Sequence, residues 1–174
     1  MQLWLGGGGE QLECEGELFS SLEQSQGPAA GGQSITLHGV ALDPAGAYSL
    51  TFTDIASQRA MEVGMAFLSD TALSGVLPPW PYQAAATAVS LIRNGTEVPK
   101  DGSGTYFYNI FASVSAVSPT AAQATGGSTL TVIGGGFQRG SSGYSCSFSC
   151  DGLTLGVSAV AVSSTAVTCE APHR

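Results

Sequence analysis

The chain of 174 residues is 43% hydrophobic and only 10% charged, so it has enough apolar material for one or two small cores and is not disordered by composition. Its formal net charge of −8 disfavours binding to nucleic acid and to anionic lipid, because both carry negative charge themselves. Met1 is followed by no basic segment of a signal peptide, and no run of about 18 apolar residues predicts a membrane-spanning helix.

The chain contains an internal repeat. Residues 31–39 read Gly-Gly-Gln-Ser-Ile-Thr-Leu-His-Gly, and residues 126–134, which follow 95 positions later, read Gly-Gly-Ser-Thr-Leu-Thr-Val-Ile-Gly. Within each copy apolar and polar residues alternate, which predicts β-strands, and clusters of Gly, Pro, Asp and Ser predict the turns between them. About seven short strands per period of this length are typical of an immunoglobulin-like β-sandwich. We therefore expect an all-β protein made of tandem modules, with a function that belongs to the module.

The repeat places the modules along the chain. Residues 1–16 are expected to form the closing hairpin of a preceding module, and residues 17–112 a complete sandwich with a turn at 93–96 and a last strand near 105–110. Residues 113–174 are expected to form a second sandwich that stops before its last strands. This pattern indicates a piece of a longer protein. Residues 56–68 contain helix-forming side chains, but their counterpart at 152–162 is rich in valine and glycine, so a strand is expected there.

Two features indicate an extracellular protein. Asn94 begins the glycosylation sequon Asn-Gly-Thr in a predicted hairpin turn, where an oligosaccharide could be attached. Cys146 and Cys169 appear together in one copy only, which is the pattern of an optional disulfide. Cys14 and Cys150 remain, and their partners are expected to lie in sequence beyond these residues.

A zinc site is the alternative interpretation of the cysteines. Cys146, Cys150, Cys169 and His173 follow the spacing C-x3-C and C-x3-H, and thiolates and imidazole are zinc ligands. The disulfide is favoured, because positions i and i+4 of one strand lie about 13 Å apart, too far to share one ion. No metal site is therefore expected.

Other polar residues suggest no chemistry. Glu13, Glu15 and Glu17 alternate on one predicted strand face; calcium would need further ligands from other loops, so a solvated edge strand is favoured. His38 is expected to face outward from its strand and is not a candidate catalytic residue. No nucleophile has a nearby base, and the run of glycines at 6–9 precedes no helix that could bind phosphate. We expect neither catalytic residues nor a cofactor.

Aromatic residues in a proline-rich stretch form the one candidate recognition element. Trp80 and Tyr82 occur in Pro-Pro-Trp-Pro-Tyr, residues 78–82, where prolines restrict the backbone. The two rings could stack on a sugar or contact a partner protein. The competing interpretation is that Trp80 packs on its own module as a plug between strands.

The second copy carries an ordered motif: an early proline, Gly-Gly, an alternating strand that ends in Gly-x-Gly-Phe, and two cysteines before a final proline. This order resembles the IPT/TIG module. The matching residues are Pro119, Gly126, Gly127, Thr131, Gly134, Phe137, Cys146, Phe148, Ser163, Thr165, Val167, Cys169 and Pro172. Residues 19–111 are similar, with Gln24 in place of the early proline and no cysteine pair.

The resemblance implies immunoglobulin-like early-set sandwiches with a scaffold or binding role and no catalytic residue. Such modules occur in plexin-like, fibrocystin-like and growth-factor-receptor-like surface proteins, in some transcription factors, and beside some polysaccharide-acting enzymes. The expected function is that of a spacer and protein-binding scaffold in a cell-surface adhesion or receptor protein, with neighbouring IPT/TIG modules and a protein or surface-glycan partner. The alternative is a carbohydrate-binding accessory module that uses Trp80 and Tyr82. The negative charge disfavours a transcription factor.

Overall fold

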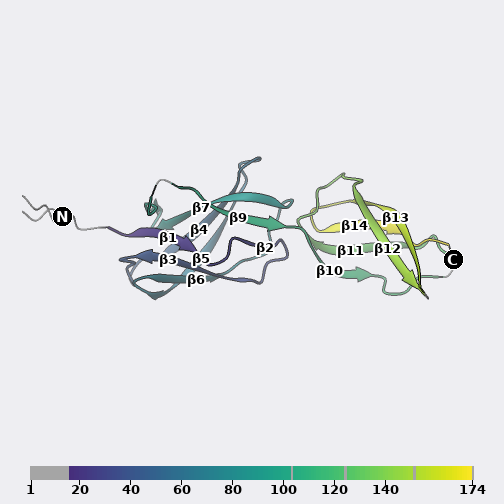
Figure 1. The fold of residues 1–174 in the computed structure, drawn as a ribbon, viewed down its shortest axis with the longest axis horizontal. Helices are drawn as coiled ribbons and strands as arrows, with labels where there is room; N and C mark the ends of the chain where they lie inside the picture. The colour runs from purple at the N-terminus through teal and green to yellow at the C-terminus, as the bar shows by residue number, and fades with distance from the viewer. Residues whose placement is uncertain (1–15, 103, 124, 151, 174) are drawn as a thin grey trace, which may run out of the picture.

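The computed structural model describes residues 16–102, 104–123, 125–150 and 152–173. The closing hairpin expected at residues 1–16 lies outside this part of the chain except for Gly16. All the regular secondary structure in the described residues consists of β-strands, which confirms the all-β fold class. The strands form two curled sheets that lie end to end along the long axis of the molecule (Figure 1).

The first sheet contains nine strands. They are β1 Leu18–Leu22, β2 Gln26–Pro28, β3 Ser34–Val40, β4 Tyr48–Asp54, β5 Ala60–Ser69, β6 Ala72–Val76, β7 Ala85–Arg93, β8 Thr96–Glu97 and β9 Tyr106–Phe111. Their order is β1-β3-β6-β5-β4-β7-β9-β2, with β8 paired to β7 alone. β5 lies within residues 56–68, whose side chains favour a helix. The structure has a strand there, as the comparison with residues 152–162 predicts.

β5 joins the two layers of this sandwich. Its first part, from Ala60 to Met65, pairs with β4, and its last part, from Ala66 to Ser69, pairs with β6. The strand therefore passes from one layer to the other, and the two layers close around a shared core. The core contains the fully buried side chains Phe19, Ile35, Leu37, Leu50, Phe52, Leu73, Val89, Leu91 and Tyr108.

The second sheet contains five strands. They are β10 Ser113–Ser118, β11 Thr129–Gly135, β12 Tyr144–Cys150, β13 Leu153–Ala161 and β14 Ala166–Glu170. Their order, β10-β11-β14-β13-β12, equals the order β1-β3-β6-β5-β4 of their repeat counterparts. β13 passes between layers as β5 does, because it pairs with β12 from Leu153 to Ala159 and with β14 from Ala159 to Ala161. Among the described residues β7, β8 and β9 have no counterpart here.

The repeated double glycine has the same structural cause in both modules. Gly31 and Gly126 have φ of +72° and +70°, which side-chain-bearing residues rarely adopt. A Cβ at Gly31 would lie 2.5 Å from the carbonyl carbon of Pro78, and a Cβ at Gly126 would lie 2.7 Å from the amide nitrogen of His173. Glycine is therefore required where the loop before β3 or β11 touches the segment that follows β6 or β14.

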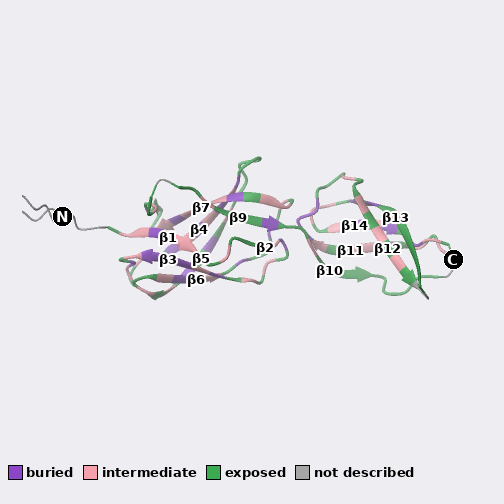
Figure 2. Ribbon diagram, viewed as in Figure 1, coloured by how far each residue is buried: buried purple, intermediate pink, exposed green. Residues whose placement is uncertain are grey.

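The two modules differ in how well they bury their apolar side chains. Figure 2 shows buried residues throughout the first module and mostly intermediate or exposed residues in the second. Phe19 on β1 is 0% exposed, whereas its repeat counterpart Val114 on β10 is 63% exposed. Phe19 is covered by Tyr106 on β9, and among the described residues β9 has no counterpart in the second module.

We expect residues 113–174 to be less stable than residues 17–112, because among the described strands β12 pairs with β13 alone and the apolar face beside it is open. Hydrogen exchange followed by mass spectrometry should show slow amides in the first module and faster amides after about residue 113. Equal protection in both parts would mean that the repeat is not the folding unit.

Candidate functional site

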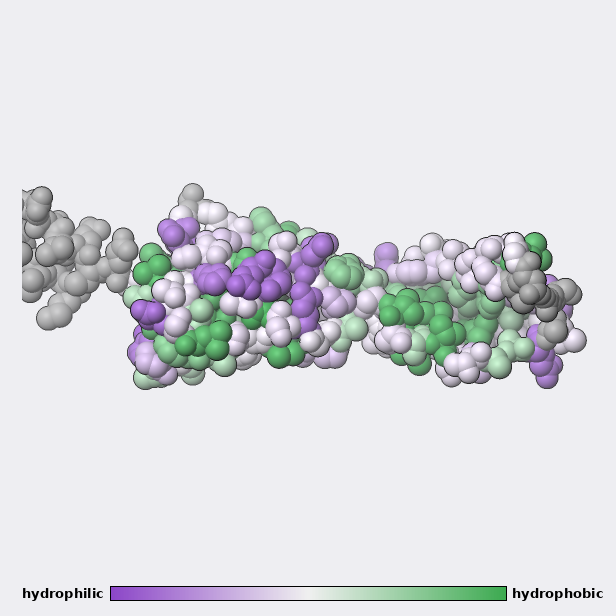
Figure 3. Space-filling model, turned by 60° about the horizontal axis from the view of Figure 1, so that its bottom comes forward, coloured by the Kyte–Doolittle hydropathy of each residue, from purple (hydrophilic) through white to green (hydrophobic). Residues whose placement is uncertain are grey.

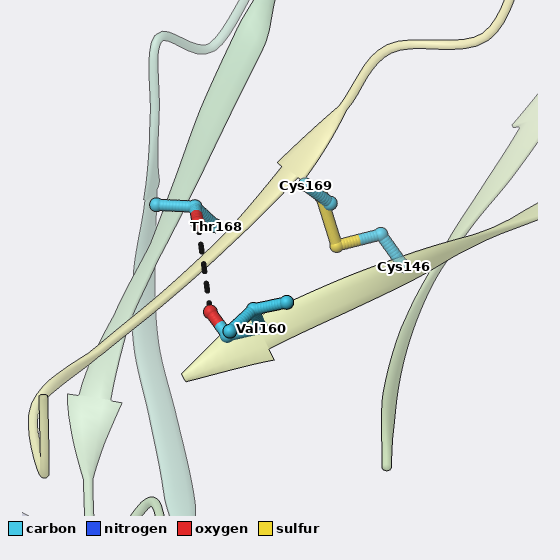
Figure 4. The surroundings of a disulfide bond; sticks show 4 residues. All are labelled: Cys146, Val160, Thr168 and Cys169. Atoms are coloured by element: carbon cyan, nitrogen blue, oxygen red, sulfur yellow. Dashed lines mark hydrogen bonds between the residues drawn. A yellow bond between two sulfur atoms is a disulfide. The ribbon is translucent and has the colours of Figure 1, made fainter. Parts of the chain in front are cut away.

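A disulfide lies inside the second module. Cys146 on β12 and Cys169 on β14 are bonded, with their Cα atoms 6.4 Å apart, as the cysteine pattern predicts (Figure 4). Beside it, the Thr168 hydroxyl donates a 3.5 Å hydrogen bond to the carbonyl of Val160, which links β14 to β13. β12 and β14 both pair with β13 and not with each other, so the disulfide ties the edge strand β12 to the middle of the sheet.

An open apolar groove runs beside this disulfide. It has a volume of about 700 Å³ and lies between β10, β11 and β12. Hydrophobic side chains gather on the face of the second module that Figure 3 shows. The lining includes Val114, Val117, Val132 and Phe148. The register of β10 shifts between Val114 and Ala116, so Val114 and Val117 lie on the same face, and the groove is an uncovered part of the sandwich core.

Trp80 lies in the core of the first module. Its side chain is 2% exposed, and its indole N–H donates a 2.8 Å hydrogen bond to the carbonyl of Gln83. Tyr82 is half-buried and meets the Trp80 ring edge-on, with centroids 5.3 Å apart, while the Arg59 guanidinium lies 5.1 Å from the centre of the Tyr82 ring. Of the two interpretations of Trp80, the structure favours the plug, because the ring is buried and its N–H has a partner within the same turn.

The segment around Trp80 forms part of a joint between the modules. The amide of Ala84 donates a 2.8 Å hydrogen bond to the carbonyl of Gly136, and the Ser164 hydroxyl donates a 3.1 Å bond to the carbonyl of Pro81. A Cβ at Gly136 would lie 2.8 Å from the Cβ of Ala29, which is closer than side chains pack. Glycine here allows the two modules to meet backbone to backbone.

The comparisons with known proteins agree with this geometry. Residues 112–174 match the model of the IPT/TIG domain. The second module therefore matches the IPT/TIG domain over its whole described length. Its double glycine, its strands and its two bonded cysteines follow one another along the chain in the order of the sequence motif. The first module repeats the strand order of the IPT/TIG domain and adds β2, β7, β8 and β9 to it.

Solved structures of plexin A4 resemble the chain at low sequence identity. One, of the full extracellular region with domains 1 to 10, aligns with a TM-score of 0.41 and 16% identity over 90% of this chain and 13% of that chain. Another, with domains 1 to 8, aligns with a TM-score of 0.43 and 9% identity over 90% of this chain and 24% of that chain. The chain thus spans less than a quarter of either plexin chain. No curated protein sequence matches it.

The glycosylation sequon lies at the turn between β7 and β8, outside the IPT/TIG domain. Asn94 and Gly95 have φ of +49° and +83°, the signs required by the tight turn of a two-residue hairpin. Asn94 is exposed, and its side-chain carbonyl accepts a 3.1 Å hydrogen bond from the amide of Ala47. The turn therefore places the Asn94 side chain at the surface. Its glycosylation stays a prediction.

Glu17 does not lie on a solvated edge strand, because β1 begins at Leu18. Its carboxylate accepts a 2.5 Å hydrogen bond from the Tyr48 hydroxyl and lies 3.3 Å from an Arg93 nitrogen. Arg93 also pairs with Asp43. The start of the first module is therefore tied to β4 and β7, which corrects the expectation for Glu17; Glu13, Glu15 and Cys14 lie outside the described residues.

Histidine and metal chemistry find no support in the described residues. His38 faces outward, as alternation predicts, and its ring lies 3.1 Å from the Glu23 carboxylate, which lowers the pKa of Glu23. The disulfide engages the sulfurs of Cys146 and Cys169, so the alternative zinc set with Cys150 and His173 loses two of its ligands. In the part of the chain that the structure describes, no three His, Cys, Asp or Glu side chains gather as metal ligands. A helix long and apolar enough to cross a membrane is likewise not found among these residues.

Tyr108 is the one large polar side chain that the fold buries without a partner among the described residues. Its ring is 0% exposed, its hydroxyl has no hydrogen bond, and burial raises the pKa of Tyr108 to about 12. Replacing Tyr108 with Phe should leave the free energy of unfolding unchanged or slightly higher, because removing an unpaired buried hydroxyl removes a desolvation cost.

The same shift predicts alkaline sensitivity. Above pH 10 the unfolded chain loses the Tyr108 proton while the folded chain keeps it, so the free energy of unfolding falls as the pH rises from 10 to about 12. Urea unfolding at pH 9 and 11 measures the loss, and it should be smaller for Tyr108→Phe than for the parent protein. Equal losses in both proteins would assign the sensitivity to other tyrosines.

Proposed function

We propose that this chain is a non-enzymatic segment of an extracellular protein, in which IPT/TIG modules act as spacers and as a protein-binding scaffold for adhesion or receptor function. Three observations support the proposal. Residues 112–174 match the IPT/TIG domain, the Cys146–Cys169 disulfide suits an oxidising compartment, and Asn94 stands in an exposed turn. The partner is a protein or a surface glycan, and further IPT/TIG modules of the same protein are the expected neighbours.

The joint between the modules carries the spacer role. β9 ends at Phe111 and β10 begins at Ser113, so one residue connects the sandwiches. The Ser113 hydroxyl accepts a 3.1 Å hydrogen bond from the amide of Ala30, in addition to the bond from Ala84 to Gly136. We infer that a connection this short, with hydrogen bonds on both sides, restricts the motion between the modules and so holds them in line.

A variant at the joint tests this role. Gly136→Val places a branched side chain against Ala29 at a φ of +78°, so it should open the joint while both sandwiches stay folded. Residual dipolar couplings should fit one alignment tensor for the parent protein and two different tensors for the variant. The matched control is Gly140→Val, which also has positive φ, at +77°, but meets nothing within 4 Å. Two independent tensors in the parent protein would contradict the spacer role.

The carbohydrate-binding alternative loses its main support. It required Trp80 and Tyr82 as a pair of exposed rings, and the structure buries Trp80. The half-buried Tyr82 remains, with Arg59 over its ring. One partly covered tyrosine offers less stacking area than the platform that a sugar site needs.

Mass spectrometry of the protein from its natural source tests the compartment. We expect a peptide pair linked through Cys146 and Cys169 and a glycan on Asn94 that peptide N-glycosidase removes. Asn94→Gln expressed through a secretory pathway is the control and should lose the glycan alone. Fully reduced Cys146 and Cys169 together with unmodified Asn94 would overturn the extracellular assignment.

A further inference from the structure

A second groove opens beside the glycosylation sequon, at the end of the first module that lies away from the joint. β7 starts next to the joint at Ala85 and ends at Arg93, so the turn at Asn94 stands at the far end of this strand. The groove, which we call the sequon groove, has a volume of about 390 Å³, within the range of about 300–1,000 Å³ typical of small-molecule sites. Its lining includes Glu17, Arg93, Asn94, Glu97, Val98 and Pro99. The side chain that would carry a glycan is therefore part of the groove wall.

Two hydrogen bonds to Ala47 fix the position of Asn94. The Asn94 backbone amide donates a 3.0 Å hydrogen bond to the carbonyl of Ala47, and the Asn94 side-chain carbonyl accepts a 3.1 Å bond from the Ala47 amide. Among the hydrogen bonds of the described residues none uses the side-chain nitrogen Nδ2, the atom that a glycan would join. The Oδ1 atom can keep its bond to Ala47 when Nδ2 is glycosylated. A sugar on Asn94 therefore starts from a fixed point on the groove wall.

Glu97 gives the sequon groove an oriented acceptor. Its Oε1 atom accepts a 2.7 Å hydrogen bond from the Ser90 hydroxyl and a 3.2 Å bond from the Lys100 ammonium. The Ser90 and Lys100 hydrogen bonds lower the pKa of Glu97, so the carboxylate stays charged at neutral pH. Its second oxygen, Oε2, accepts no hydrogen bond from the described part of the chain. Oε2 is thus available for a hydroxyl or amide donor, with which a charged oxygen forms a strong hydrogen bond.

The rest of the lining is held in place or apolar. The Arg93 guanidinium pairs with Asp43 and lies 3.3 Å from the Glu17 carboxylate, so two carboxylates hold it at the rim. Pro99 is exposed, and Val98 next to it is buried. A pyranose ring carries hydroxyls at its rim and C–H groups on its faces. It therefore fits a groove that combines a charged acceptor with a proline ring.

We propose that the sequon groove holds the first N-acetylglucosamine of a glycan attached to Asn94, which donates a hydrogen bond to Oε2 of Glu97 and packs a ring face on Pro99. The inference rests on the glycosylation of Asn94 in the proposed function. One carboxylate and one proline are few contacts for a free sugar, but the covalent bond to Asn94 makes them intramolecular and raises the effective concentration of the sugar. Because Glu17 lines the same groove, the docked sugar braces the β7–β8 turn against the start of the module.

Trimmed glycoprotein tests the site. The full chain is secreted from cells that attach oligomannose glycans and trimmed with endoglycosidase H to one N-acetylglucosamine. The reference is the same chain exported to the bacterial periplasm, which attaches no such glycan. We expect amide exchange in residues 95–98 to be about tenfold slower in the trimmed protein, the effect of about one added hydrogen bond. Nuclear Overhauser effects should join sugar ring protons to the Pro99 side chain.

Two variants separate the groove from a general effect of the sugar. Glu97→Ala removes the acceptor, so the trimmed and the sugar-free forms of this variant should exchange at equal rates in residues 95–98. The matched control is Glu62→Ala, which removes another carboxylate that accepts a hydrogen bond from a serine, Ser49, but lies outside the groove. The trimmed form of this control should show the same slower exchange as the trimmed parent protein.

Three results would overturn the proposal. A sugar on Asn94 without the Overhauser effects and without slower exchange would show that it points into solvent, and the extracellular assignment would stand. Slower exchange that persists in Glu97→Ala would place the sugar outside the groove. An unmodified Asn94 in the secreted chain would overturn this inference together with the glycosylation on which it rests.

Discussion

The Trp80→Ala variant is expected to lower the free energy of unfolding of the first module by about 3–5 kcal/mol, the usual loss for a large aromatic side chain removed from a core. The Trp80 side chain is 2% exposed and packs edge-on against Tyr82. Its removal leaves a cavity and takes the donor from the Gln83 carbonyl. Urea unfolding followed by far-ultraviolet circular dichroism measures the change.

Two controls separate packing from surface effects. Val76→Ala changes a side chain that is 61% exposed and should shift the free energy of unfolding by no more than about 0.5 kcal/mol. Trp80→Phe keeps a ring and loses the N–H donor, so its loss should be smaller than that of Trp80→Ala. A Trp80→Ala protein of unchanged stability that loses binding to an immobilised glycan would restore the stacking platform and contradict the plug.

The effect of Trp80 should extend to the second module. The Trp80 amide donates a 2.8 Å hydrogen bond to the carbonyl of Ala29, the residue that packs against Gly135 and Gly136. The segment after Trp80 bonds to the second module through Pro81 and Ala84. The Trp80 side chain fills the core of the first module, while the backbone of the same segment contacts the joint, so we expect loss of the side chain to loosen the joint as well.

The repeat made most of the fold predictable. It aligns the copies residue by residue, so strand evidence in one copy decides an ambiguous segment in the other. β5 is the clearest case: its residues favour a helix by propensity, and the valines of the counterpart β13 favour a strand. The disulfide followed from the same comparison, because Cys146 and Cys169 replace Leu50 and Gly75 together.

The sequence left two interpretations of Trp80, an exposed ring and a buried plug, and it could not decide between them because burial depends on the packing of the whole module. The acceptor of the Trp80 N–H is local, on the carbonyl of Gln83, whereas the partners of Glu17 are distant in the sequence. Glu17 meets Tyr48 and Arg93, which are 31 and 76 positions away in the sequence. Alternation along one strand places a side chain on a face and does not specify what that face meets.

A signal for the joint was present in the sequence where the copies differ. Val40 and Ala41 end the alternating block in the first copy, and Gly135 and Gly136 stand at the same positions in the second. Both Ala41 and Gly136 have positive φ, so the backbone turn is shared, but only the second copy needs glycine to approach Ala29. Differences between repeats mark what one module does in addition to folding.

Loss of the Cys146–Cys169 disulfide is expected to lower the free energy of unfolding of the second module by about 3 kcal/mol, because a bond between residues 23 positions apart restricts the unfolded chain. Within the described part of the chain, little else offsets this loss, since β12 pairs with β13 alone and the groove beside it is open. Hydrogen exchange should show faster amides in β12 and β14 of Cys146→Ala/Cys169→Ala and unchanged amides in the first module.

The experiment needs a background without other thiols, so Cys14→Ala/Cys150→Ala serves as the parent and should keep the disulfide. Reducing this parent with dithiothreitol cuts the same bond without changing a side chain, and it should reproduce the faster exchange of β12. Exchange that is equal in the reduced and oxidised forms would mean that pairing with β13 alone fixes β12. In that case the hydrogen bonds to β13 alone would hold β12 in place, and the disulfide would not contribute to the stability of the second module.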